Sequence, residues 1–100
     1  MSQPEPSFLP ELEAVIRRRL ESGVDESYTA RLAKAGVKRI AQKVGEEAVE
    51  LALAAVAGER EETVSEAADL VYHLIVLLNE QGIRLADIEA ELQARHRARD

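Results

Sequence analysis

The feature that most constrains this chain is a pair of long stretches that are apolar on almost every side. The first covers residues 37–57, and the second runs from about residue 61 or 63 to residue 81. Apolar residues recur in both at helical spacing, and each helix has only one narrow row of polar side chains. A surface helix normally has a narrower apolar stripe. One neighbouring helix cannot cover such surfaces, so we expect a second copy of the chain to cover part of them.

The flanking segments predict shorter helices. Apolar residues at helical spacing cover residues 8–22. Ser27 is placed to cap a helix that begins at Tyr28 and that Gly36 interrupts. A last amphipathic helix is indicated by three apolar residues, Leu85, Ile88 and Leu92. No segment alternates with period two, so the predicted fold class is an all-α bundle of four to five helices, completed by homodimerisation.

Length and composition exclude several classes of protein. One hundred residues make one domain, and we expect it to span residues 1–100, with residues 1–6 flexible and residues 24–27 as a connector. The chain has no cysteine, which excludes disulfides and thiolate metal sites. No apolar run approaches the roughly 20 residues that span a bilayer, and no signal peptide is recognisable. We therefore expect a cytoplasmic protein without a membrane partner.

Charge is segregated along the chain. The net charge is −6, but residues 44–73 carry −7 and residues 17–43 carry +5. A nucleic-acid-binding protein needs a dominant basic face, so we expect no nucleic-acid partner. The segregation fits a site where carboxylates bind a metal and nearby bases bind an anion. Salt-bridged helix surfaces explain it equally well.

The polar rows of the two long helices are acidic. Glu46, Glu47 and Glu50 share the first row with Arg39 and Lys43. The second row holds Glu62, Glu66, Asp69, His73 and Glu80. Neighbouring carboxylates repel one another on a helix, and more strongly in a partly buried groove. A hard divalent cation, Mg²⁺ first and Mn²⁺ next, would remove that repulsion. The alternative is a solvated acidic face on each helix.

Two motifs resemble a known superfamily. Lys43-Val-Gly-Glu-Glu-Ala-Val-Glu50 and Glu66-Ala-Ala-Asp69 resemble the signature of the all-α, MazG-type nucleoside triphosphate pyrophosphatases. The flanking words Ser27-Tyr-Thr29 and Ser65-Glu-Ala-Ala-Asp-Leu-Val-Tyr-His73 resemble its phosphoribosyl-ATP pyrophosphatase branch. This resemblance implies hydrolysis of phosphoribosyl-ATP to phosphoribosyl-AMP and pyrophosphate, the second step of histidine biosynthesis. It also implies Mg²⁺-dependent cytoplasmic homo-oligomers, dimers at least, whose sites combine helices of two chains.

By the same resemblance, four carboxylates become the expected metal ligands: Glu47, Glu50, Glu66 and Asp69. Glu46 is expected either to orient the attacking water or to pair with Lys43 or Arg39. Lys43 and, more weakly, Arg39 are expected to bind phosphate, with ion pairs to the neighbouring glutamates as the alternative.

His73 lies one helical turn beyond Asp69. It is expected either to take part in binding substrate, through support of the ligands or proton transfer, or simply to bond to Asp69.

Three other interpretations of these sequence features are considered. A related pyrophosphatase acting on a free (deoxy)nucleoside triphosphate would use the same carboxylates. A non-enzymatic helical dimerisation module would explain the apolar helices but not the paired carboxylates. A di-iron bundle needs a Glu three residues before each His, and those positions are Leu70 and Gln93.

Overall fold

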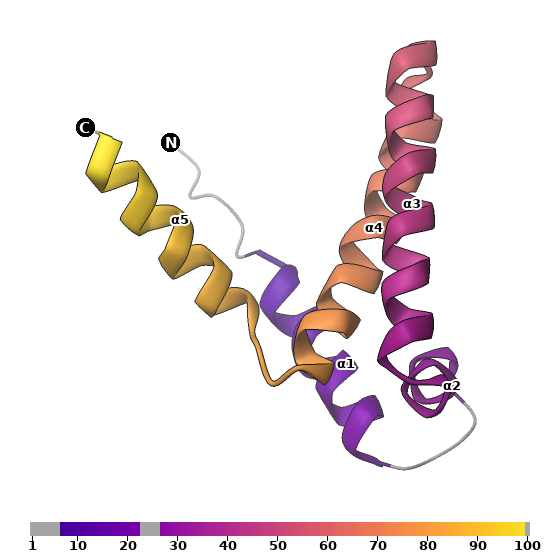
Figure 1. Ribbon diagram of the computed structural model, residues 1–100, viewed down its shortest axis with the longest axis vertical. Helices are drawn as coiled ribbons and strands as arrows, with labels where there is room; N and C mark the ends of the chain where they lie inside the picture. Colours follow the sequence, from indigo (N-terminus) through magenta and orange to yellow (C-terminus); the bar gives the residue numbers. More distant parts are fainter. Residues whose placement is uncertain (1–6, 23–26, 100) are drawn as a thin grey trace.

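The chain folds into five helices and, within the residues described, no strand. The computed structural model describes residues 7–22 and 27–99, so the expectations for residues 1–6 and for most of the 24–27 connector fall outside it. The helices are α1 (Leu9–Ser22), α2 (Tyr28–Ala35), α3 (Val37–Ala57), α4 (Arg60–Glu80) and α5 (Leu85–Arg99) (Figure 1). The prediction of an all-α fold is confirmed.

Capping residues explain some of the helix boundaries. Ser27 caps α2 as predicted, because its hydroxyl accepts a hydrogen bond from the Ala30 amide at 3.0 Å. Gly58 ends α3 in the left-handed conformation, at φ 75°. The predicted start of α4 at residue 61 or 63 is slightly late. Thr63 does not cap the helix, because its hydroxyl donates to the Glu59 carbonyl at 2.6 Å, one turn back.

α3 and α4 form a long helical hairpin, and the hydrophobic core lies at its base. Figure 1 shows the two helices side by side, with α1 and α2 packed near their lower ends. The core consists of Ile16 from α1, Leu32 from α2, Ile40 from α3, and Ile75 and Val76 from α4. The upper half of the hairpin therefore has no second layer in a single chain.

α5 extends from the opposite side of the base as a separate arm. None of its residues is buried. Its start is held by Glu13, a buried residue of α1 whose carboxylate accepts hydrogen bonds from the Leu85 amide at 2.8 Å and the Asn79 side chain at 3.0 Å. The two arms give the molecule the shape of a V (Figure 1).

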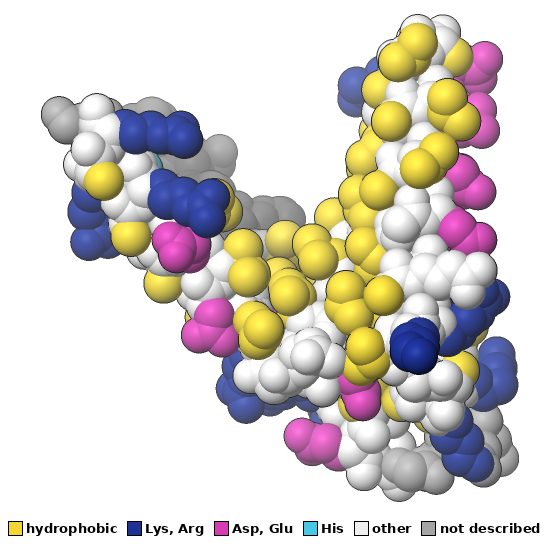
Figure 2. All heavy atoms as spheres, in the orientation of Figure 1, with side chains coloured by type: hydrophobic (Ala, Val, Ile, Leu, Met, Phe, Trp, Pro, Cys, Tyr) yellow, Lys and Arg dark blue, Asp and Glu magenta, His cyan; other side chains and the backbone are white. Residues whose placement is uncertain are grey.

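Apolar side chains line much of the inside of the V (Figure 2). On the hairpin, large apolar residues are more than half exposed: Val49, Leu53, Val56 and Val64. On the α5 arm, Ile88 and Leu92 are also exposed. The wide apolar surfaces of α3 and α4 thus remain uncovered within one chain. No helix in the described part of the chain is long and apolar enough to span a membrane.

Candidate active site

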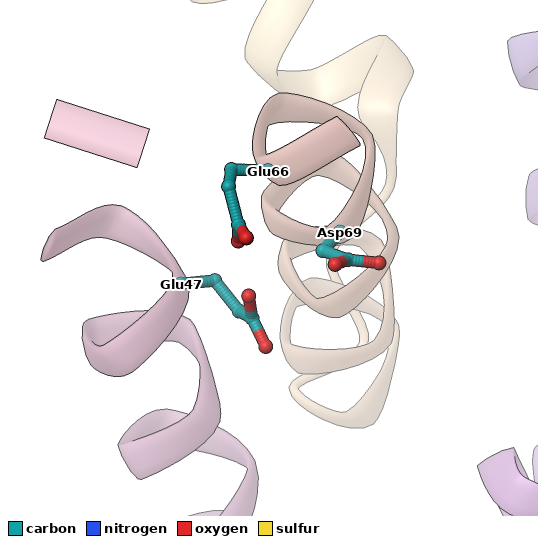
Figure 3. Close-up of side chains that lie close together, drawn as sticks. All are labelled: Glu47, Glu66 and Asp69. Carbon is teal, nitrogen blue, oxygen red and sulfur yellow. The ribbon is translucent and has the colours of Figure 1, made fainter. Parts of the chain in front are cut away.

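Three carboxylates converge where α3 faces α4. Glu47 of α3 offers one oxygen, Glu66 and Asp69 of α4 offer one each, and these atoms all lie within 4.8 Å of one another. Figure 3 shows Glu47 and Glu66 pointing toward each other across the hairpin, with Asp69 beside them on α4. The spacing of three residues places Glu66 and Asp69 on the same side of their helix. Glu47 is buried, Glu66 is half-buried and Asp69 is exposed.

The electrostatics of Glu66 show that this cluster is unfavourable by itself. Partial removal from water raises the pKa of Glu66 from 4.5 to about 7, with further contributions from the Glu50 carboxyl, through hydrogen bonding and charge, and from Glu47. The Oε2 atom of Glu66 is buried and has no hydrogen-bond partner among the described residues. A cation bound by oxygen ligands would give Glu66 Oε2 a partner and lower the repulsion between the carboxylates.

The donor set fits a hard divalent cation. All the converging atoms are carboxylate oxygens, which Mg²⁺ and Mn²⁺ prefer over softer ligands. Oxygens at about 2.1 Å from Mg²⁺ lie up to about 4.2 Å apart, so small side-chain movements would bring the three groups within its reach.

Glu50 lies beside this cluster rather than inside it. It is one turn along α3 from Glu47, and it is close enough to Glu66 to raise the pKa of that residue. It also lines an acidic groove of about 450 Å³ with Glu59, Glu62 and Glu66. Of the four expected ligands, the structure therefore brings three together and places the fourth next to them.

The basic residues of α3 are engaged with its glutamates. Lys43 Nζ lies 3.4 Å from Glu47 Oε1, and this hydrogen bond raises the pKa of Lys43 above 10.5. Arg39 lies 3.8 Å from Glu46, and both side chains are half exposed. The ion-pair alternatives considered for Lys43, Arg39 and Glu46 are thus present in the structure. The Lys43 ammonium adjoins the carboxylate cluster, where phosphate oxygens would approach a bound cation.

His73 is buried, and protein groups occupy both of its ring nitrogens. Nδ1 lies 2.8 Å from the main-chain carbonyl of Asp69, and Nε2 lies 2.6 Å from the Tyr28 hydroxyl. The expected bond to Asp69 therefore exists, but it involves the backbone and not the carboxylate. Direct contact between His73 and a substrate would require breaking one of these hydrogen bonds.

Sequence reasoning missed the partner of His73. From the sequence we expect Tyr28 to pack, although the resemblance also allows it to contact a substrate. The words Ser27-Tyr-Thr29 and Tyr72-His73 contain the signal, since two adjacent hydrogen-bonding residues on one helix meet two on another. Only the fold shows that these words face each other.

An all-α chain with carboxylates converging between two long antiparallel helices is typical of the all-α nucleoside triphosphate pyrophosphatases. A family model described as phosphoribosyl-ATP pyrophosphohydrolase matches residues 9–96. The chain belongs to this family.

Similar proteins agree with this assignment. A phosphoribosyl-ATP pyrophosphatase of Pyrobaculum arsenaticum is 57% identical over 89 residues, which cover 89% of this chain and 95% of that protein. One from Pyrobaculum islandicum is 56% identical over 90 residues, or 96% of its length. The histidine biosynthesis bifunctional protein HisIE of Photobacterium profundum is 54% identical over 94 residues, and the chain spans 45% of its length.

Proposed function

We propose that this chain hydrolyses phosphoribosyl-ATP to phosphoribosyl-AMP and pyrophosphate, as the second step of histidine biosynthesis. Family membership and the similarity to HisIE proteins support this reaction. The observation that carries most weight is the convergence of Glu47, Glu66 and Asp69 within 4.8 Å, since hydrolysis of a triphosphate requires compensation of its negative charge.

The proposed cofactor is Mg²⁺, with Mn²⁺ as a substitute. Glu47, Glu66 and Asp69 would hold it together with Glu50, which lies beside Glu66. When bound, such an ion neutralises phosphate oxygens and lowers the pKa of water. The buried, unpartnered Oε2 of Glu66 supports this assignment.

The roles proposed for the remaining polar residues rest on the resemblance and on the partners that these residues have in the structure. Lys43 would leave its ion pair with Glu47 and bind a phosphate oxygen, and Arg39 would add positive charge one turn further along α3. Glu46 would hold and orient the attacking water as a general base. His73 would support the binding of substrate without contacting it directly, through its hydrogen bonds to the Asp69 carbonyl and to Tyr28.

We further propose a cytoplasmic homodimer in which each chain covers the exposed apolar surfaces of the other. Four large apolar residues on the hairpin are 57–88% exposed, and the α5 arm adds Ile88 and Leu92. Contiguous apolar surface of this kind is typical of interfaces between subunits.

The test is an assay of the purified chain with Mg²⁺ and a panel of triphosphates. We expect phosphoribosyl-ATP to be the best substrate, with pyrophosphate released in equal amount to phosphoribosyl-AMP. Faster turnover of dCTP or dUTP would instead identify a pyrophosphatase of free nucleotides. Absence of hydrolysis for every triphosphate, together with stable dimers, would favour the non-enzymatic dimerisation module.

A further inference from the structure

The chain has three aromatic residues other than histidine, and only one lies beside the candidate active site with its ring accessible. Phe8 lines an apolar groove against α1 and α4, with Val64 and Ala67 among the lining residues. Tyr72 is half-buried, and its hydroxyl bonds to Thr29. Tyr28 is 42% exposed, and it is near enough to Lys43 to contribute to that residue's raised pKa.

A buried histidine fixes the orientation of this exposed ring. His73 is 6% exposed, and its Nδ1 faces the Asp69 carbonyl, which can only accept a hydrogen bond. In the neutral imidazole, Nδ1 therefore carries the proton, and Nε2 accepts one from the Tyr28 hydroxyl at 2.6 Å. The two rings meet at 88° with centroids 5.6 Å apart, and the short contact is at the hydroxyl end of Tyr28. His73 thus holds the ring by its hydroxyl, while Tyr28 as a whole is 42% exposed.

A second hydrogen bond next to the first strengthens this attachment. The hydroxyls of Thr29 and Tyr72 bond to each other, and Thr29 is fully buried. Two adjacent residues of α2 therefore bind two adjacent residues of α4. Ser27 caps the same turn of α2, so the backbone that carries Tyr28 is fixed as well. The Tyr28 ring therefore loses little conformational entropy when a ligand binds to it, and such preorganisation favours affinity.

The same elements connect the ring to the carboxylate cluster. His73 bonds to the backbone of Asp69, whose carboxylate belongs to the cluster. Lys43, near Tyr28, pairs with Glu47 of that cluster at 3.4 Å. If the phosphates of a nucleotide bind at Lys43 and the carboxylates, its base can reach the Tyr28 ring.

We propose that Tyr28 determines specificity for the purine nucleotide: its ring, held in place by His73, stacks on the purine base while Lys43 and the carboxylate cluster bind the phosphates. This inference rests on the proposed function, since it names the group that recognises the base of that substrate. Flat aromatic rings bind nucleobases by stacking, and the typical strength corresponds to about 5-fold to 150-fold in affinity. His73 is then a positioning residue that acts through Tyr28.

The test separates binding of the base from binding of the phosphates. Tyr28→Leu removes the ring, Tyr28→Phe removes only the hydroxyl that His73 holds, and Phe8→Leu is the matched control, because it removes an exposed ring outside the site. For Tyr28→Leu we expect KM for phosphoribosyl-ATP to rise about tenfold, while kcat and the inhibition constant of inorganic tripolyphosphate change less than about threefold. Tyr28→Phe should raise KM by a smaller factor, and Phe8→Leu should leave KM unchanged. Equal weakening of both ligands by Tyr28→Leu, or no change in KM, would overturn the proposal.

A second measurement uses the unmodified chain and does not depend on turnover. The chain has two tyrosines, so the Tyr28 ring protons are assigned by comparison with the spectrum of Tyr72→Phe. Titration with Mg²⁺ and the non-hydrolysable α,β-methylene-ATP should shift the Tyr28 ring signals upfield, whereas tripolyphosphate should leave them in place. Absence of that shift at saturation would exclude stacking even in an active enzyme. Failure of the proposed function would look different, because the wild-type chain would then not release pyrophosphate from phosphoribosyl-ATP.

Discussion

Glu66 is the residue at the candidate site whose ionisation most clearly lowers the stability of the fold. The pKa of Glu66 is raised to about 7 in the folded chain, whereas its ordinary pKa, taken for the unfolded chain, is 4.5. The folded chain therefore binds a proton at this carboxyl far more tightly than the unfolded chain does. The folded state therefore loses stability as pH rises from about 4.5 to about 7, and above pH 7 the loss is complete. A carboxylate kept under these conditions is typical of a functional site.

Replacing this carboxylate should stabilise the metal-free protein at high pH. In the presence of a chelator, we expect Glu66→Gln to melt at a higher temperature than the wild type at pH 8. The difference should shrink as pH falls toward 4.5, since the wild-type side chain is then protonated in both states. Thermal unfolding monitored by circular dichroism across this range measures it. Glu62→Gln, an exposed position on the same helix, is the matched control; an equal gain for both variants would contradict the role of burial at Glu66.

Loss of a converging carboxylate should remove activity without unfolding the chain. We expect Asp69→Asn to lower kcat/KM for phosphoribosyl-ATP by about 10³-fold, because several kcal/mol of charge stabilisation depends on the cation. Asp69 is exposed, so helicity should be nearly unchanged. Steady-state kinetics checks this, with Glu61→Gln in the first turn of α4 as the control. Full activity of Asp69→Asn would remove this residue from the site.

At the scale of the elements, the turn between α3 and α4 sets the hairpin that brings the carboxylates together. Gly58 adopts φ 75°, where an L side chain is strained, although a Cβ there would meet no atom within 4 Å. Gly45 lies in the middle of α3 with equally open surroundings and without positive φ. Both glycines thus leave room for a Cβ, but only Gly58 has a positive φ.

Alanine at these two positions should change stability in opposite directions. We expect Gly58→Ala to lower the free energy of unfolding by about 1–2 kcal/mol, the cost of a left-handed L residue. Gly45→Ala should raise it by about 0.5–1 kcal/mol, because alanine loses less backbone freedom in a helix. Urea denaturation at one protein concentration measures both. The same sign for the two variants would show that backbone conformation does not decide their effects.

The helices were largely predictable because their signals are local. The 3.6-residue period, the Ser27 cap and the glycines after α2 and α3 predict α2 and α3 within a residue of their observed bounds. α4 begins at Arg60, before the predicted residue, and the Thr63 side chain bonds one turn back in the helix instead of capping it. The direction of α5 was not predictable, since it depends on Glu13 meeting Leu85 across 72 residues of chain.

The candidate site was predictable in part for the same reason. Spacing along each helix placed Glu47 in one acidic row, and Glu66 and Asp69 in the other, and the motif resemblance paired the rows. The packing of α3 on α4 decides which carboxylates lie within 4.8 Å of one another and which one lies beside them. The hydrogen bond between Tyr28 and His73 joins residues 45 positions apart and has no periodic signal.

At the scale of the whole molecule, one chain leaves an open V with apolar inner surfaces (Figure 2). A chain of 11.0 kDa with a small core at one end buries little of the rest of its hairpin. A second copy seated against these surfaces would supply the missing layer.

The wild-type chain should therefore sediment as a dimer of about 22 kDa, twice the mass of one chain. We expect Val56→Glu to shift it toward the monomer, because Val56 is 88% exposed on α3 and a buried charge at an interface is costly. Gln42→Glu adds the same charge at an exposed polar position of α3 and should remain dimeric. Sedimentation of the wild type at 11.0 kDa would contradict the dimer.

Binding of Mn²⁺ followed by electron paramagnetic resonance tests the central claim most directly, because it detects the ion without requiring turnover. We predict that the wild-type chain binds Mn²⁺ at neutral pH, that Mg²⁺ displaces it, and that Glu47→Gln weakens binding about 100-fold or more while Glu61→Gln does not. Equal Mn²⁺ affinity for the wild type and Glu47→Gln, with helicity preserved in both, would show that the carboxylates between α3 and α4 do not hold the metal.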